Sequence, residues 1–451
     1  MEVVIEMERM KRTAANHLVK WSRYNVIVPS DETRWLLYNT TNARLLAFKA
    51  NPQPIQTYYE EGKELFAGHE KLYELGFLVD ASINELSVVR SEFDRLKDPR
   101  SQSLFILPTE QCNFRCIYCY EEFIKQKMAP ELRQGLITWV RNHAPEWNDF
   151  SVAWFGGEPL AAYDIVCELS EAFIDICYST GCHYTASMTT NGYLLKFERA
   201  QRLRNIGVHR YQITLDGVGA EHDAKRHLIS GKGTYDTIMQ NLMDIHYSEL
   251  DVSITIRMNI DQNNGPHIYR LIDVLAEKLE GDPRFQFSMH LIGKWGGGND
   301  GNLSVYEQND GVCTLTEATR YGIEKGLNSG FFEQMLPNTP CYAAMPNSLV
   351  VGSDGTVYKC TVAFDNPINH VGTLHPDGRL DINDQYFAQW VVDGATDSTC
   401  QSCQVHPMCH GSSCPLIRIE ENTRPCPTVR KDLPAFIRLL DINTQVAQTR
   451  A

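Results

Sequence analysis

Regular alternation of strand-like and helix-like segments between residues 103 and 292 constrains the fold of this 451-residue chain more than any other feature. Apolar, β-rich runs predict strands at 103–107, 151–155, 184–189, 210–215, 252–258 and 285–291. Segments with helical periodicity separate them, including 161–178, 196–205, 234–247 and 267–280. Such alternation implies parallel strands joined by right-handed crossovers. The predicted fold is therefore α/β, an open, partial (β/α)6 barrel.

Residue types that carry chemistry follow these strands. The carboxyl ends of parallel strands share one face, where active sites form. A loop with three cysteines follows the first strand, "GGEP" the second, "TNG" the third and "DG" the fourth. The sequence therefore predicts one site built from several loops, with these candidates: Cys112, Cys116, Cys119, Gly156, Gly157, Glu158, Asn191, Asp216, Arg257 and Asn259.

Cysteine usage points to metal binding. The chain has 14 cysteines, and its start, "MEVVIEMERMKRTAANHLVKW", is too charged for the apolar core of an export signal. Metal ligation therefore explains the cysteines better than a disulfide framework does. Cys167, Cys177 and Cys182 stand apart and are expected to be small buried hydrophobes. The second cysteine set comprises Cys341, Cys360, Cys400, Cys403, Cys409, Cys414 and Cys426.

Charge and hydropathy narrow the range of partners. The formal net charge of −14 argues against non-specific binding to nucleic acid or to an anionic membrane surface. No run approaches the roughly 18 apolar residues that a spanning helix needs. The sequence favours a cytoplasmic protein with no nucleic-acid or membrane partner.

The spacing C-x3-C-x2-C, from Cys112 to Cys119, supplies three thiol ligands. A structural zinc site needs four protein ligands, whereas a [4Fe–4S] cluster has four iron corners. Three cysteines would leave one iron open to a small molecule. The vacant corner is then the reactive position.

This motif resembles the signature of the radical S-adenosylmethionine superfamily, with Tyr118 as its aromatic residue. The resemblance implies that S-adenosylmethionine chelates the open iron and is cleaved to a 5′-deoxyadenosyl radical, which abstracts hydrogen from the substrate. It further implies that Gly156, Gly157 and Glu158 form the motif that receives the ligand's ammonium group. Asn191 and Asp216 would hold its ribose and methionine end, and Arg226 would pair with its carboxylate.

The second cysteine set resembles the SPASM extension of such enzymes, although its last spacing is x4 where x3 is usual. The resemblance implies two auxiliary [4Fe–4S] clusters. Cys400, Cys403, Cys409 and Cys426 would complete one, and Cys341, Cys360 and Cys414 would hold the other. The fourth position of that triad is left open, or is filled by His410 or Cys313. Structural zinc knots are the alternative, and the clusters could relay electrons, staple the chain, or do both.

The sequence suggests five segments: a small α+β, winged-helix-like module (1–95), the radical core (100–300), a bridging segment (301–335), a Cys-rich iron–sulfur domain (336–430) and a closing helix (431–451). Related peptide-modifying enzymes often carry an N-terminal module of this kind, which binds a leader peptide as an extra strand. A purely structural module is the alternative.

These resemblances predict an enzyme that modifies a ribosomally made precursor peptide by forming a thioether or C–C cross-link, with electrons from a flavodoxin- or ferredoxin-type donor. Peptide epimerisation needs a hydrogen donor, and no catalytic residue is evident from the sequence. An anaerobic sulfatase maturase is the other alternative, but Thr361 stands where that group has an aspartate base, and the N-terminal module is longer than usual. A non-catalytic electron carrier would not explain Glu158 or Arg226.

Overall fold

The computed structural model describes residues 18–31, 33–391, 393–394 and 397–450. Residues 1–17, which form most of the charged start of the sequence, lie outside the described part. Among the helices that are described, none is both long enough and apolar enough to cross a bilayer.

The centre of the fold is a parallel sheet whose strand order follows the chain. All six predicted strands are present and each pairs in parallel with the next. The sheet remains open, as predicted for a partial barrel, because its two end strands do not pair with each other. The strands are β7 (Ser101–Ile106), β9 (Asp149–Trp154), β10 (His183–Thr190), β11 (Val208–Thr214), β13 (Ser253–Ile260) and β14 (Phe285–Leu291).

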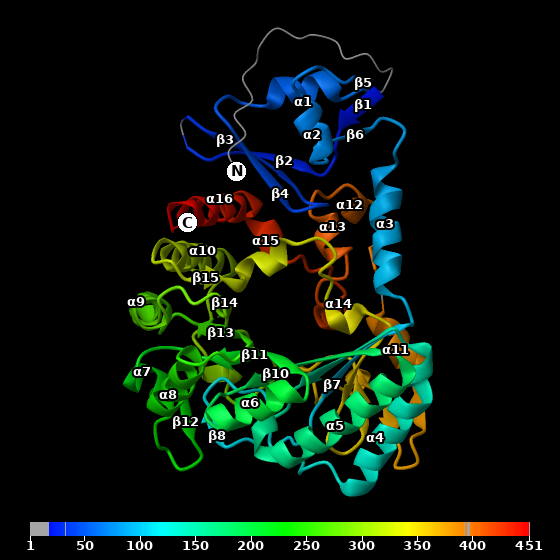
Figure 1. Ribbon diagram of the computed structural model, residues 1–451, viewed down its shortest axis with the longest axis vertical. Coiled ribbons are helices and arrows are strands. Elements are labelled where there is room, and N and C mark those ends of the chain that lie inside the picture. Colours follow the sequence, from blue (N-terminus) through cyan, green and yellow to red (C-terminus); the bar gives the residue numbers. More distant parts are fainter. Residues whose placement is uncertain (1–17, 32, 392, 395–396, 451) are drawn as a thin grey trace.

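Helices between these strands cover the outer face of the sheet (Figure 1). In α9 (Ile268–Leu279), for example, Ile268, Leu271, Ile272 and Leu275 are buried, and this helical spacing places them on one face. The four predicted helices are observed within two residues of their expected limits. The covering helices are α4 (Pro130–His143), α5 (Tyr163–Thr180), α6 (Phe197–Asn205), α8 (Tyr235–His246) and α9.

The sheet continues beyond the barrel into the Cys-rich region. β16 (Ser348–Val351) lies parallel to β7, with Leu349 opposite Leu104. Three antiparallel strands follow, and β15 (Asn328–Ser329) extends the other end of the sheet. The sequence predicts no strands in this region, because strands of two to five residues are too short to show periodicity. The three strands are β17 (Thr356–Tyr358), β18 (His370–Leu374) and β19 (Leu380–Ile382).

The N-terminal part contains two antiparallel sheets, ordered β5-β1-β6 and β2-β3-β4. The sequence also predicts a helical segment around 61–75, and this prediction is wrong over most of its length. Gly62 and Gly68 have positive φ there, and only the last third is helical. The elements are β1 (Leu18–Trp21), β2 (Asn25–Pro29), β3 (Trp35–Asn39), β4 (Arg44–Phe48), α1 (Gln53–Tyr59), β5 (Lys63–Glu64), α2 (Glu70–Glu74) and β6 (Leu78–Asp80).

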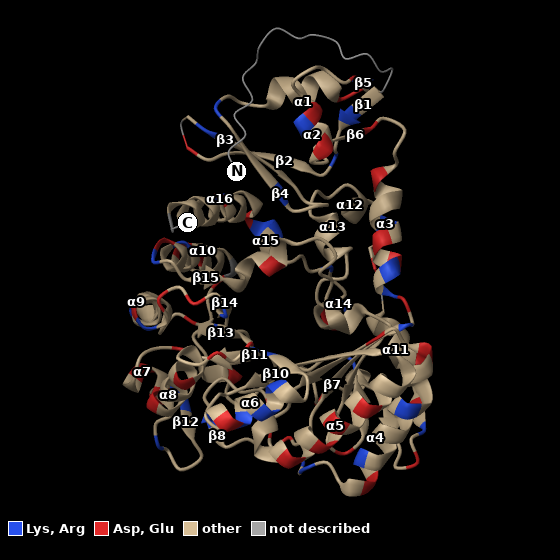
Figure 2. Cartoon of the chain, in the orientation of Figure 1, with Lys and Arg blue, Asp and Glu red and all other residues tan. Residues whose placement is uncertain are grey.

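The N-terminal sheets pack onto the rest of the chain. Val28 and Leu36 belong to the same buried cluster as the barrel, and the Tyr38 hydroxyl donates a 2.6 Å hydrogen bond to the Met335 carbonyl. α16 (Leu433–Arg450) lies between this sheet and α10 (Gln308–Glu324) (Figure 1). α3 (Glu85–Leu96) descends along one side towards the barrel, and charges of both signs mark its surface (Figure 2).

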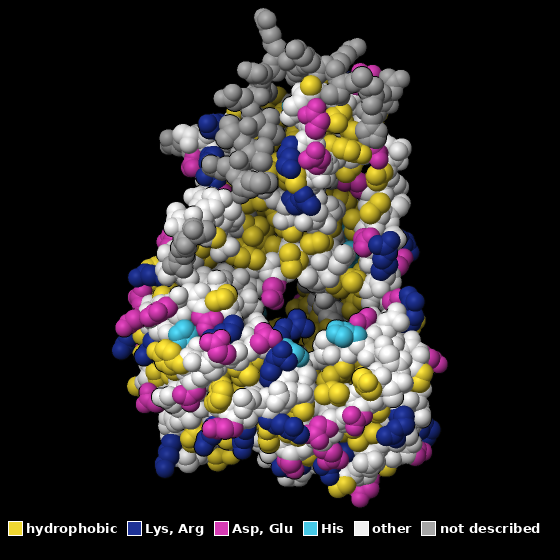
Figure 3. Space-filling view, in the orientation of Figure 1, with side chains coloured by type: hydrophobic (Ala, Val, Ile, Leu, Met, Phe, Trp, Pro, Cys, Tyr) yellow, Lys and Arg dark blue, Asp and Glu magenta, His cyan; other side chains and the backbone are white. Residues whose placement is uncertain are grey.

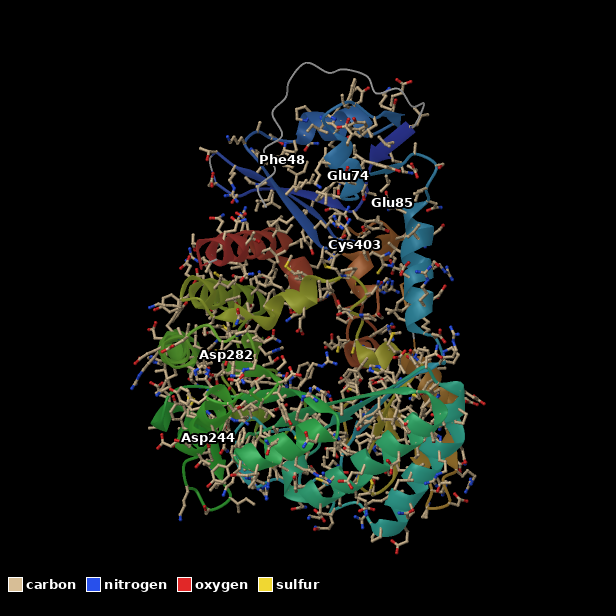
Figure 4. The ribbon with its side chains drawn as sticks, viewed as in Figure 1. Phe48, Glu74, Glu85, Asp244, Asp282 and Cys403 are labelled. Carbon is tan, nitrogen blue, oxygen red and sulfur yellow. The ribbon has the colours of Figure 1, made fainter. Side chains whose placement is uncertain are left out.

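Short helices occupy the middle of the molecule, between the N-terminal sheets and the barrel (Figure 1). Cys403, labelled in Figure 4, lies among them. These helices are α12 (Ser398–Gln401), α13 (His406–Cys409), α14 (Pro415–Glu421) and α15 (Thr428–Lys431), whereas α11 (Asp384–Trp390) packs against β18 and α14 at the level of the barrel.

Candidate active site at the barrel mouth

The three-cysteine loop is held in place by a strand pair that sequence reasoning did not predict. β8 (Phe114–Cys116) runs antiparallel to β12 (Arg226–Leu228), which follows the short helix α7 (Ala220–Lys225). Arg226 lies directly opposite Cys116. Burial raises the pKa of the Cys116 thiol, and the facing guanidinium opposes that rise. This pair therefore brings a cation from the fourth βα unit against the cysteine loop of the first.

Tyr118 is the centre of a buried polar network. Its hydroxyl donates to the Asp216 carboxylate and accepts hydrogen bonds from Arg226 Nη1 (2.7 Å) and Asn259 Nδ2 (3.2 Å). Asp216 Oδ1 also accepts the Asn259 backbone N–H at 2.8 Å. The structure thus brings together Tyr118, Asp216, Arg226 and Asn259, four of the candidates found in the sequence.

The predicted glycines allow two loops to approach closely. A Cβ atom on Gly157 would lie 2.5 Å from the Gln111 carbonyl oxygen, and one on Gly156 would lie 2.4 Å from that of Thr109. Both distances are too short for a side chain. The "GGEP" loop is therefore packed directly against the start of the cysteine loop, as the glycine pattern suggests.

Glu158 is fully buried and orders the next loop. Its carboxylate accepts hydrogen bonds from Leu160 N (2.9 Å), Thr190 Oγ1 (2.7 Å) and Asn191 N (2.7 Å). Asn191 Nδ2 in turn lies 3.9 Å from Cys112 Sγ. Three protein donors thus already engage Glu158, so its evident structural role is to position Asn191. Its predicted contact with an ammonium group stays a prediction.

Arg226 fits an anionic ligand. Its side chain is buried, and its Nε is among the buried polar atoms that have no hydrogen-bond partner. Although burial opposes the charged form, Cys116, Tyr118 and Asp216 hold the pKa of Arg226 well above its usual value. A charged guanidinium group with an unused N–H donor is well suited to bind a carboxylate.

Cys341, Cys360 and Cys414 lie close together at the start of the sheet extension. The pKa of Cys341 is raised to about 12, mainly by burial and in part by the neighbouring Cys360 and Cys414 thiols. The predicted triad is thus assembled from three distant stretches of chain.

Cys400, Cys403, Cys409 and Cys426 line one cavity of about 250 Å³. Two arginines face the sulfur atoms: Arg424 Nη1 lies 3.6 Å from Cys400 Sγ, and Arg430 Nη1 lies 3.4 Å from Cys426 Sγ. A cluster bound by four thiolates is an anion, so these cations fit the predicted iron–sulfur ligation. Sequence reasoning missed the two arginines because surface arginines are usually solvated.

No three His, Cys, Asp or Glu side chains in the described part of the chain converge closely enough to bind a single metal ion.

The two candidates for a fourth ligand of the triad lie elsewhere. The His410 ring stacks on Phe93 at 4.4 Å, and its Nε2 contacts Asn338 Oδ1 at 2.9 Å. Cys313 is exposed on α10, with its Sγ 3.6 Å from Glu317 Oε1. The contacts of His410 and Cys313 therefore do not support either residue as the fourth ligand of the cysteine triad.

A further set of contacts holds the cysteine loop in place, and nothing in the sequence indicated it. Lys125 Nζ donates to the Tyr358 hydroxyl at 2.5 Å and lies 3.7 Å from Glu110. Glu110 accepts a hydrogen bond from Ser353 Oγ at 3.1 Å. The loop that follows β7 is thereby tied to the β16–β17 hairpin, a contact that only the folded sheet creates.

Comparison with known protein families identifies the domain that contains the barrel. Residues 106–274 match the model of the Radical SAM superfamily. This segment of the chain therefore has the radical S-adenosylmethionine domain, whose superfamily uses a [4Fe–4S] cluster and S-adenosylmethionine.

Curated relatives with similar sequences have several activities. Fe-coproporphyrin III synthase of Methanosarcina barkeri is 27% identical over 49% of this chain and 52% of its own, so that match spans about half the relative. GTP 3′,8-cyclase of Sulfurimonas denitrificans is 24% identical over 61% of this chain and 84% of its own. The AdoMet-dependent heme synthase of Oleidesulfovibrio alaskensis is 23% identical over 67% and 80%.

Two solved structures share the fold over more of the chain. Native anSMEcpe with bound AdoMet and Cp18Cys peptide has a TM-score of 0.58 at 18% identity, covering 76% of this chain and 99% of its own. Streptococcus suis SuiB bound to precursor peptide SuiA has a TM-score of 0.50 at 16% identity, covering 88% and 95%. At these identities the likeness concerns the fold alone.

Proposed function

We propose that this enzyme modifies a ribosomally synthesised precursor peptide, forming a thioether or C–C cross-link. The observation that carries the proposal is the combination of one barrel-mouth cysteine triad with two further thiol groups, Cys341/Cys360/Cys414 and the Cys400 cavity, in a single fold. The fold likeness to SuiB, which was solved with its precursor peptide, supports the same substrate class.

In this proposal the residues at the barrel mouth hold the cofactors. Cys112, Cys116 and Cys119 would ligate the [4Fe–4S] cluster, and Arg226 and Asn191 would bind S-adenosylmethionine. When bound, the two groups together supply a strong hydrogen-abstracting radical. The protein's own part is to fix the ligand through Arg226 and to support that arginine through the Tyr118–Asp216 network.

The two auxiliary clusters belong to the proposal as well. Cys400, Cys403, Cys409 and Cys426 would hold one, and Cys341, Cys360 and Cys414 the other. A flavodoxin- or ferredoxin-type protein would supply electrons. The triad's open position would suit a substrate thiolate, which favours thioether formation among the cross-links.

A groove beside β6 offers a place for the leader peptide. β6 is an edge strand, paired only with β1 in the described sheet. A cavity of about 350 Å³ runs between Val79 of β6 and Val88 of α3, and 49% of Val88 is exposed. An added peptide strand would extend the sheet and place its apolar side chains in this groove.

The sulfatase-maturase alternative gains no support from the site. Thr361, which stands where a base would be needed, is buried, and its Oγ1 lies 2.8 Å from the Tyr342 hydroxyl. A threonine in this setting has no acidic proton to exchange near neutral pH.

The test is anaerobic reconstitution followed by assay. The protein should bind about 11–12 iron atoms and release 5′-deoxyadenosine with a reductant and S-adenosylmethionine, and Cys116→Ala should abolish the release. The substrate itself would be sought among small peptides encoded beside the gene. Val88→Glu should weaken binding of that peptide, with Tyr178→Glu as an exposed control on α5. If the mass of the peptide is the same before and after incubation with the active enzyme, the proposal is refuted.

A further inference from the structure

The inner face of the barrel half formed by β11, β13 and β14 is polar. Along β13, Ile254, Ile256 and Met258 are buried in the main core, whereas the intervening Arg257 is only partly buried. Successive residues of a strand point to opposite faces. Arg257 therefore projects into the barrel, between Thr214 of β11 and Ser288 of β14, its register neighbours.

A hydrogen bond holds one nitrogen of the Arg257 guanidinium group, and the two terminal nitrogens remain available to a ligand. Its Nε donates a 2.8 Å hydrogen bond to Asn259 Oδ1, and Asn259 is in turn tied to Tyr118. In the described part of the chain, no hydrogen bond or ion pair engages its two terminal nitrogens. The guanidinium thus presents two parallel donors from a preset position.

The surroundings compensate this charge only in part. Burial lowers the pKa of Arg257, and the charged form of the nearby Arg226 lowers it too. The one carboxylate close to it, Asp216, already accepts hydrogen bonds from Tyr118 and Asn259. The nearby Tyr118 and Tyr120 are neutral phenols. His290 is neutral as well, because burial and then Arg257 lower its pKa to about 3.

A partly desolvated cation without an ion-pair partner is costly, and a bound anion would offset that cost. We infer that Arg257 is a substrate-recognition residue that binds a carboxylate of the peptide. Its planar fork matches a carboxylate in a way that a lysine would not. Ser288, opposite Arg257, and His290, whose Nε2 lies 3.1 Å from Ser288 Oγ, give the site further polar atoms.

This inference rests on the proposed peptide substrate and sharpens it. The carboxylate is either an internal Asp or Glu side chain or the carboxyl terminus of the peptide, and both present the same group to the fork. Arg226, by contrast, faces Cys116 and is assigned to the cofactor. The two arginines would thus separate cofactor binding from substrate binding.

The experiment uses the reconstituted holoenzyme with S-adenosylmethionine and three matched probes. Acetyl-GGEGG-amide carries a side-chain carboxylate, acetyl-GGQGG with a free end carries a terminal one, and acetyl-GGQGG-amide carries none. Affinities are measured by ligand-observed NMR for the wild type, Arg257→Gln, Arg257→Lys and the control Arg210→Gln. Arg210 is an exposed arginine on the neighbouring strand β11.

We expect one carboxylate probe to bind roughly tenfold or more tightly than the neutral probe, and the tighter one identifies the source of the carboxylate. Arg257→Gln should abolish the difference, Arg257→Lys should reduce it, and Arg210→Gln should leave it unchanged. Equal binding of all three probes would overturn the inference. So would loss of S-adenosylmethionine binding in Arg257→Gln without any change in probe preference.

Glutarate serves as a probe without a peptide backbone. Glutarate binding through Arg257 as tight as that of the peptides would support an anion-binding site at Arg257. It would also contradict a peptide as the substrate. If the Arg257→Gln enzyme modifies the precursor peptide at the normal rate, the proposed function is retained, but the role of Arg257 in substrate recognition is refuted.

Discussion

Arg226 lies opposite Cys116 in the antiparallel pair β12–β8, and its Nη1 donates a 2.7 Å hydrogen bond to the Tyr118 hydroxyl. One arginine therefore touches two positions of the cysteine motif, 108 to 110 residues away in sequence. This contact couples the order of the cysteine loop to the place where an anionic ligand would bind.

The assignment of Arg226 to the ligand's carboxylate predicts the behaviour of its variants. Arg226→Gln should raise the dissociation constant of S-adenosylmethionine roughly tenfold or more, because a charge-assisted hydrogen bond is lost. Arg226→Lys should have a smaller effect. Equilibrium dialysis of the reconstituted protein measures both, with Arg270→Gln on the surface as the control. Unchanged affinity in Arg226→Gln would contradict the assignment.

Gly157→Ala should destabilise the cysteine loop. Its Cβ would lie 2.5 Å from the Gln111 carbonyl oxygen, a backbone atom that cannot move aside easily. We expect a loss of about 1–3 kcal/mol in the free energy of unfolding, together with less iron at the first site. Urea denaturation and iron analysis measure these effects. Gly298→Ala is the control, since no atom lies within 4 Å of its added Cβ, and equal behaviour of the two variants would count against the packing argument.

His222 should make stability depend on pH. Burial, then Arg226, lowers its pKa from 6.5 to about 3, and its Nδ1 accepts the Asp216 N–H at 3.2 Å. Between pH 6.5 and 3 the unfolded chain therefore binds a proton that the folded chain does not. The stability that this neutral histidine contributes is fully present above pH 6.5 and is lost as the pH falls.

The corresponding measurement is the urea midpoint from pH 7 to 4. His222→Gln should reduce the slope by up to one proton, about 1.4 kcal/mol per pH unit. His183→Gln, on an exposed side chain, should leave the slope as it is in the wild type. A slope that does not change in His222→Gln would show that other groups account for the acid sensitivity.

Arg424 should tune the cluster predicted in the Cys400 cavity. Its Nη1 lies 3.6 Å from Cys400 Sγ, so Arg424→Gln removes a cation and a donor from the sulfur. Reduction adds negative charge, and the reduction potential of that cluster should therefore fall. An anaerobic redox titration followed by EPR measures the change, with Lys431→Gln on α15 as the control. An unaltered potential with full iron content would refute the role.

Much of the barrel was predictable because its signals are local. The six strands and the helices between them show their periodicity in the sequence. The short strands β16 to β19 gave no such signal. The helix expected at 61–75 failed because Gly62 and Gly68 interrupt it.

The sequence by itself indicated the strands and helices of the barrel, the loops that carry the motifs, and the resemblance of residues 106–274 to a radical S-adenosylmethionine domain. Motif spacing and periodicity are properties of neighbouring residues, so they can be read before the fold is known. Tertiary structure alone decided that Arg226 faces Cys116 and that Arg424 and Arg430 face the thiol quartet. It also decided that Arg257 enters the barrel with a hydrogen bond to Asn259 but no ion-pair partner among the described residues. Those relationships depend on which distant segments the sheet brings together. Burial then changes the energy of each charge, and no local pattern encodes that.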